Sequence, residues 1–141
     1  DPGSQLVKLC HRHNIEVVPC SGPSSLMLAL MGSGLNGQSF AFLGYIPAKT
    51  DERRQALKSI EKHSASAHQT KIMIETPYRN DSLFADILNV CQGSTELCVA
   101  ADITMPDAYI MTKTVAEWKR YVAGKESIIG KRPCVFLILA H

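Results

Sequence analysis

The stretch SGPSSLMLALMGSGLNG, residues 21–37, decides between two folds for this chain. It holds three glycines at the G-x-G-x-x-G spacing of a dinucleotide-binding loop, namely Gly32, Gly34 and Gly37. In that loop the first glycine directly follows a strand, and the last lies in the first turn of a helix. Here the apolar run of residues 23–33 predicts a helix in front of the glycines, and the strand-like SFAFLGY of residues 39–45 follows them. We therefore expect a helix that ends at Gly34 and a connecting loop, without a nucleotide cradle.

Segments with helical and strand periodicity alternate on both sides of this stretch. Amphipathic or capped runs predict helices over residues 4–13, 51–63, 77–91 and 115–122. Short β-branched or apolar runs predict strands over residues 15–20, 70–75, 96–102, 108–112 and 134–140. Helices that alternate with strands indicate an α/β fold.

The composition is that of an ordinary globular domain. The 141 residues are 45% hydrophobic and 20% charged, and a net charge of +2 neither requires nor excludes a nucleic-acid partner. The longest apolar run, residues 134–140, is too short to span a bilayer, so no membrane partner is expected. The five cysteines are odd in number and contain no C-x-x-C, which predicts free thiols in a cytoplasmic protein without a metal site.

Three strand-to-helix junctions are the places where the sequence offers a ligand site. They are SGPSS at 21–25, ETPYRN at 75–80 and ADITMPD at 101–107. Ser24 and Ser25 can cap a helix or approach a ligand, and their spacing leaves both interpretations open. Glu75 ends a core strand, so its carboxylate needs a partner, and Arg79 four residues later is the natural one. That pair is either structural or functional.

Four blocks in order along the chain carry a family resemblance. They are DPGSQLV (1–7), IEVVPCSGPSSLMLALMGSGL (15–35), FAFLGYIPAKTDERRQAL (40–57) and IMIETPYRNDSL (72–83). In this order they resemble the tetrapyrrole (corrin and porphyrin) methylase superfamily, whose members are S-adenosylmethionine-dependent methyltransferases with two α/β lobes. The P-A-K block with paired arginines and the E-T-P-Y-R block are most similar to the ribosomal RNA small-subunit 2′-O-ribose methyltransferase branch.

The resemblance also implies an arrangement of lobes. Residues 1–20 would be the last helix and strand of an N-terminal lobe, and residues 21–37 the connection between lobes with its helix. Residues 38–141 would be a C-terminal α/β lobe with a mixed sheet of about five strands flanked by helices. Asp1-Pro2-Gly3 would then be the cut end of a longer chain, so that this C-terminal part is expected to be inactive by itself.

The family's cofactor contacts can be carried over position by position. The resemblance implies that S-adenosylmethionine is held by Ser24, Ser25, Glu75 and the backbone near Thr112. It also makes Tyr78 and Arg79 candidates for substrate contact. Glu75 is the candidate for a base that assists a hydroxyl nucleophile, and no other catalytic residue is identified.

The substrate stays open between RNA and a tetrapyrrole-like small molecule. The RNA-methylating branch has an Arg-Glu pair and a Thr-Lys pair where this chain has residues 101–106, so two cations that could hold phosphates are missing. A basic stripe remains at Lys49, Arg53, Arg54 and Lys58, which is either an RNA groove or a solvated helix face. Superfamily members are often homodimers, so a homodimer is expected. The alternative to an enzyme is a non-catalytic binding or dimerisation module derived from the superfamily.

Overall fold

A five-stranded mixed sheet forms the centre of the protein in a computed structural model that describes residues 2–141. The strands are β1 (Phe40–Tyr45), β2 (Thr70–Ile74), β3 (Glu96–Ala101), β4 (Tyr109–Thr114) and β5 (Cys134–Leu139). Their order across the sheet is β1-β2-β5-β3-β4. β1 and β2 are parallel, and every other neighbouring pair is antiparallel. The expected mixed sheet is therefore confirmed.

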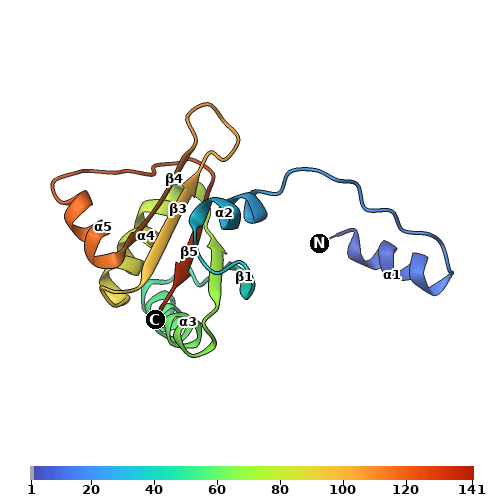
Figure 1. Ribbon diagram of the computed structural model, residues 1–141, viewed down its shortest axis with the longest axis horizontal. Coiled ribbons are helices and arrows are strands. Elements are labelled where there is room, and N and C mark those ends of the chain that lie inside the picture. Colours follow the sequence, from blue (N-terminus) through green and yellow to red (C-terminus); the bar gives the residue numbers. More distant parts are fainter. Residues whose placement is uncertain (1) are drawn as a thin grey trace.

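Five helices form within residues 2–141, and all but the first flank the sheet (Figure 1). They are α1 (Ser4–Arg12), α2 (Ser25–Ser33), α3 (Thr50–Ala67), α4 (Asn80–Val90) and α5 (Val115–Val122), with a single 3-10 turn, η1 (Pro77–Arg79), before α4. The helices α3, α4 and α5 pack on one face, and α2 packs on the other. Because side chains alternate along each strand, both faces of the central strands are apolar and both are buried.

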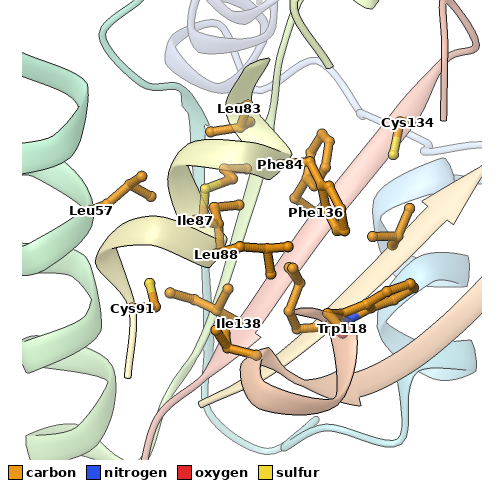
Figure 2. Close-up of a cluster of buried hydrophobic side chains, with 14 of the residues drawn as sticks. Leu57, Leu83, Phe84, Ile87, Leu88, Cys91, Trp118, Cys134, Phe136 and Ile138 are labelled. Atoms are coloured by element: carbon orange, nitrogen blue, oxygen red, sulfur yellow. The ribbon is translucent and has the colours of Figure 1, made fainter. Parts of the chain in front are cut away.

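The larger core lies between the sheet and α3, α4 and α5 (Figure 2). Leu83, Phe84, Ile87 and Leu88 recur along α4 at helical spacing and point toward the sheet. Trp118 of α5 is fully buried among them. Its indole Nε1–H donates to the carbonyl oxygen of Leu97 at 2.8 Å, so the one polar atom of the ring is satisfied.

The smaller core lies beneath α2. The helix contacts β3, β4 and β5, and its residues Ala29 and Leu30 belong to this cluster. The sheet contributes Ile72, Cys98, Ala100, Val135 and Leu137 to this cluster. The helix ends where the sequence predicts, because Gly34 is the C-cap with a left-handed φ of 72°. The prediction of its start is wrong by two residues, since Ser24 is the N-cap and Pro23 lies outside the helix.

The strand predicted over residues 15–20 does not form. These residues are exposed and have no regular secondary structure, and Figure 1 shows them linking α1 to α2 apart from the sheet. A strand satisfies its backbone groups through neighbouring strands, and none of the five strands in residues 2–141 lies beside this segment. The apolar side chains that gave the pattern, such as Ile15 and Val18, are therefore exposed. Within the described residues no helix is both long enough and apolar enough to cross a membrane.

Candidate functional site

A cleft of about 330 Å³ opens at one edge of the sheet. It is lined by Ser25, Ile74, Glu75, Pro77, Ala100, Asp102, Ile103, Met105, Pro133, Cys134 and Val135. The lining is mainly apolar, with three polar side chains placed among the hydrophobic ones. That composition is typical of a site for a small organic ligand or a cofactor.

The strand directions explain why these residues meet. β2 and β3 both end at this edge, and β5 begins there because it is antiparallel to both. Ile74 pairs with Val135, and Ala101 pairs with Cys134, so three strand ends lie side by side. Ser25, the first residue of α2, also lines the cleft and places a helix N-terminus there. Two of the three predicted junctions, SGPSS and ETPYRN, thus meet in one place, and the third, ADITMPD, joins them through Asp102.

Glu75 is the most strongly held polar residue of the cleft. Its side chain is 2% exposed, with Arg79 Nε 3.1 Å from Oε1 and Arg53 Nη1 3.6 Å from Oε2. The backbone N–H of Thr76 also donates to Oε1 at 2.7 Å. The expected Glu75–Arg79 pair is therefore confirmed. Oε2 makes no hydrogen bond within residues 2–141, and it is buried with Arg53 Nη1 as its ionic neighbour.

Arg53 does not belong to the basic stripe predicted on α3. It is 2% exposed, and its guanidinium lies between the carboxylates of Glu75 and Asp86, with Nε 2.8 Å from Asp86 Oδ2. Arg54 also pairs with Asp86, at 3.1 Å. The stripe prediction is wrong at Arg53, which is buried against Glu75, directly after β2, and Asp86 of α4, while Arg54 keeps a half-exposed side chain. The signal was present in the spacing, since Arg53 lies four residues before the buried Leu57 on the same helical face.

The predicted serines and Thr112 lie at different ends of α2. The Ser24 hydroxyl caps the helix by accepting from Met27 N at 3.5 Å, whereas Ser25 faces the cleft. Thr112 lies within β4 rather than after it, and its hydroxyl donates to the carbonyl oxygen of Ser33 at 2.7 Å. The structure therefore brings Ser25 and Glu75 together and does not bring Thr112 to the same cleft.

Tyr78 and Arg79 lie at the rim. Tyr78 is exposed, and Arg79 Nη1 donates to its hydroxyl at 2.7 Å with the guanidinium carbon 4.8 Å from the ring centre. Arg79 Nη2 donates to Thr76 Oγ1 at 2.8 Å. The Glu75 carboxylate raises the pKa of Arg79, so the side chain is a permanent cation.

Asp102 lies in the predicted junction 101–107, and its pairing with Arg132 is what the sequence did not reveal. Asp102 has a left-handed φ of 50° at the end of β3, and its Oδ2 lies 3.7 Å from Arg132 Nη1. Thr104, in the same loop, has a φ of 73°. Non-glycine residues in this region carry strain of about 1–3 kcal/mol, and such residues cluster at functional sites. No periodic pattern marks a pair that is thirty residues apart in the chain.

A second, larger cleft of about 490 Å³ lies at the opposite edge of the sheet, between α3 and the α4–β3 loop. It mixes both signs of charge, with Lys58 and Lys62 beside Glu61. None of the predicted site residues lines it. Within residues 2–141, no group of three or more His, Cys, Asp or Glu side chains is arranged to hold a metal ion.

Sequence comparison finds relatives that match most of this chain. It is 36% identical over 127 residues to the ribosomal RNA small subunit methyltransferase I of Vibrio cholerae, a match that covers 90% of this chain and 43% of the relative. The protein of the same name from Pseudomonas aeruginosa is 31% identical over 138 residues, covering 98% of this chain and 47% of the relative. The chain thus spans less than half the length of these relatives. No protein-family model matches it.

Two solved methyltransferase structures share this fold at low sequence identity. Cobalt precorrin-4 methyltransferase CbiF, a cobalamin biosynthetic enzyme, matches with a TM-score of 0.56 and 14% identity over 97% of this chain and 57% of that one. The methyltransferase CobJ matches with a TM-score of 0.55 and 13% identity over 97% and 58%. At this level of identity the likeness concerns the fold, and it confirms the fold that the resemblance predicted.

Proposed function

The chain is a homologue of the ribosomal RNA small subunit methyltransferase I proteins, and on that premise we propose that it forms part of a methyltransferase that uses S-adenosylmethionine to methylate RNA. The observation that carries the proposal is the cleft in which Ser25 and Glu75 meet, because the family resemblance implies a cofactor contact for each of them. The nucleophile would be a ribose 2′-hydroxyl.

The residues of the cleft fit such a cofactor. Apolar walls such as Ile74 and Ile103 suit an adenine ring, and the helix N-terminus at Ser25 offers unpaired backbone N–H groups. Glu75 lines the cleft, and its carboxylate can accept a hydrogen bond from the cofactor. The cofactor supplies an activated methyl group, and the protein's part is to position it and to exclude water.

Glu75 is the candidate base in this proposal. Two guanidinium groups, of Arg53 and Arg79, hold its carboxylate in place. We therefore assign Glu75 first to cofactor binding and second to catalysis. Ser24 would support the cofactor site indirectly, by capping the helix that presents Ser25. Tyr78 and Arg79 would contact the substrate at the rim of the cleft. The cofactor contact near Thr112 would lie in another part of the cofactor site, outside this cleft.

RNA is favoured over a tetrapyrrole by the name of the relatives. The fold brings one cation, Arg132, to residues 101–106, where it pairs with Asp102 at 3.7 Å. A tetrapyrrole-like substrate is supported only by the fold that the chain shares with a precorrin methyltransferase, and no residue of the cleft points to it.

Three further assignments follow from the same family. Residues 1–20 would belong to an N-terminal lobe, residues 21–37 to the connection, and residues 38–141 to the C-terminal lobe. A homodimer would cover exposed apolar side chains on α2 and β1, such as Met31 and Tyr45. All five cysteines are unpaired, which favours a reducing compartment such as the cytoplasm.

Calorimetric titration of S-adenosylhomocysteine into the 141-residue chain tests the proposal. We expect binding in the micromolar range. Ser25→Phe would place a ring in the cleft from an exposed position at the start of α2, and it should abolish binding while leaving the melting temperature unchanged. Ser94→Phe, in the cleft at the opposite edge, is the matched control and should bind normally.

The titration also separates the enzyme from the alternative module. A chain that is folded and binds no S-adenosylhomocysteine would contradict the assignment of this cleft and favour a non-catalytic binding or dimerisation role. Equal loss of binding in the Ser25 and Ser94 variants would show that the cofactor is not held where we place it.

A further inference from the structure

Positive charge is concentrated in one segment of the chain. Residues 109–133 hold six of the 15 Lys and Arg but two of the 13 Asp and Glu. The remainder of the chain has nine basic and eleven acidic residues. The small net charge of +2 is therefore the sum of a basic segment and a slightly acidic remainder. In the fold this segment is β4, α5 and the loop that leads into β5.

Two of the basic side chains of this region, Lys113 and Lys125, lie beside one aromatic ring. Lys125 Nζ lies 3.5 Å from the ring centre of Tyr121, and Lys113 Nζ lies 4.9 Å from it. The ring centre of Tyr121 is 5.7 Å from that of the buried Trp118, in an edge-on contact, so the core holds the Tyr121 ring in place. Tyr121 is 40% exposed, and neither lysine forms an ion pair within residues 2–141. Two ammonium groups beside one ring make this surface locally positive, and an anion would neutralise that charge.

A chain of contacts connects this cluster with the cleft. Asp102, in the cleft, pairs with Arg132, whose guanidinium carbon lies 6.0 Å from the ring centre of Tyr109. Tyr109 and Tyr121 share a hydrogen bond, which together with burial raises the pKa of Tyr109 to about 12. The arrangement follows from the strand directions, because β4 begins at the edge where β3 ends, and α5 runs back toward that edge.

The loop of this region is held in place rather than free. Asn80 Nδ2 donates to the carbonyl oxygen of Arg132 at 2.6 Å, and Asp81 accepts from Ser127 Oγ at 2.8 Å and from Gly130 N at 3.3 Å. Both acceptor and donor groups come from the start of α4, directly after the turn that follows Glu75. The cleft and the basic loop are therefore positioned by the same element.

We propose that Lys113, Lys125 and Tyr121 form a docking surface for the phosphodiester backbone of single-stranded RNA, continuous with the cofactor cleft. This inference rests on the proposed function and names where its substrate lies. Lysines bind backbone phosphates without regard to sequence, and an aromatic platform among basic residues is typical of surfaces for single-stranded nucleic acids. The cleft at the opposite edge is the weaker candidate, because Glu61 and Glu96 lie among its basic residues.

Fluorescence anisotropy with a labelled 20-nucleotide single-stranded RNA tests the proposal on the 141-residue chain. We expect the double variant Lys113→Gln/Lys125→Gln to bind about tenfold more weakly at moderate salt, because each lost phosphate contact removes one released counterion. The slope of log K against log salt should become shallower by about 1.4, which is about 0.7 for each lysine on a single strand.

Matched variants separate this surface from a general effect of charge. Lys58→Gln/Lys62→Gln removes the same charge at the opposite edge and should leave RNA affinity within twofold. Tyr121→Phe keeps the ring and should bind as the wild type does, whereas Tyr121→Leu should weaken binding several-fold. Unchanged affinity in Lys113→Gln/Lys125→Gln, or an equal loss in the Lys58 and Lys62 variant, would overturn the proposal.

The cofactor titration keeps the two proposals distinguishable. S-adenosylhomocysteine should bind Lys113→Gln/Lys125→Gln as it binds the wild type, since neither lysine lines the cleft. RNA binding that depends on these lysines in a chain without cofactor affinity would support the docking surface and count against the proposed function. A chain that binds the cofactor, and whose RNA affinity does not change when these lysines are replaced, would support the proposed function and count against the docking surface.

Discussion

Arg53 and Arg54 are neighbours in sequence with different surroundings. Arg53 is buried between two carboxylates and also donates to Ser82 Oγ at 2.7 Å, while the Arg54 side chain is 48% exposed and pairs with Asp86 alone. The difference arises because one position faces the sheet and the other faces solvent on the same turn of α3. Removing one member of a buried charge network destabilises the fold, because it leaves another charge buried without a partner.

Arg53→Ala should lower the free energy of unfolding by about 3 kcal/mol, because it leaves Glu75 and Asp86 buried with fewer countercharges. Arg54→Ala, on the same helix and against the same aspartate, should cost about 1 kcal/mol or less, since the pair is half exposed. Urea denaturation of both variants measures the difference. Equal costs would mean that burial of Arg53 does not determine its contribution.

α5 shows how a short element is specified by its first turn. Thr114 is the N-cap, its hydroxyl accepts from Glu117 N at 3.2 Å, and Glu117 Oε2 accepts from Thr114 N at 2.9 Å. This capping box satisfies two backbone N–H groups that the helix cannot pair internally. The helix has eight residues, so the cap is a large part of what determines its start, and it places both Trp118 and Tyr121.

Thr114→Ala should therefore destabilise the protein by about 1 kcal/mol, the usual cost of a lost N-cap. Thr114→Ser keeps the hydroxyl and should cost less than half as much. Thermal and urea unfolding give both values. Because the cap holds Tyr121 in place, Thr114→Ala should also weaken RNA binding slightly, and Thr114→Ser should not.

Two buried thiols link the stability of the whole protein to pH. Burial raises the pKa of both Cys91 and Cys134 from 9.0 to about 12. In the unfolded chain these thiols ionise near their ordinary value, so above pH 9 the unfolded state holds fewer protons than the folded state. The stabilising effect is complete below pH 9 and is lost between pH 9 and about 12.

Unfolding free energy should therefore fall above pH 9 by about 1.4 kcal/mol per pH unit for each of the two thiols. The double variant Cys91→Ala/Cys134→Ala should be less stable at pH 7 and should show a flatter alkaline profile. Burial lowers the pKa of Lys71, which gives a slope of opposite sign, but Lys71 is present in both proteins and cancels in the difference. Cys20→Ala, at an exposed position, should leave the profile unchanged. Parallel wild-type and double-variant profiles would refute the assignment.

The sequence by itself determined the features that depend on local chemistry. The left-handed Gly34 after an apolar run, the amphipathic α4 and the short apolar strands could each be predicted, because caps and periodicity act over a few residues. The pairing of Glu75 with Arg79 could also be predicted, since four residues separate them across a turn. The family resemblance implies that Ser25 and Glu75 both contact the cofactor, and the fold places both in one cleft.

Tertiary structure decided everything that depends on which elements become neighbours. Residues 15–20 have the pattern of a strand and form none, because a strand needs a partner at its edge and no strand within residues 2–141 lies beside it. Arg53 is in the core because carboxylates from β2 and α4 meet it there, and Asp102 meets Arg132 because β5 inserts between β2 and β3. A local pattern records the preference of a segment, while burial and ion pairing are set by the segments that the chain brings against it.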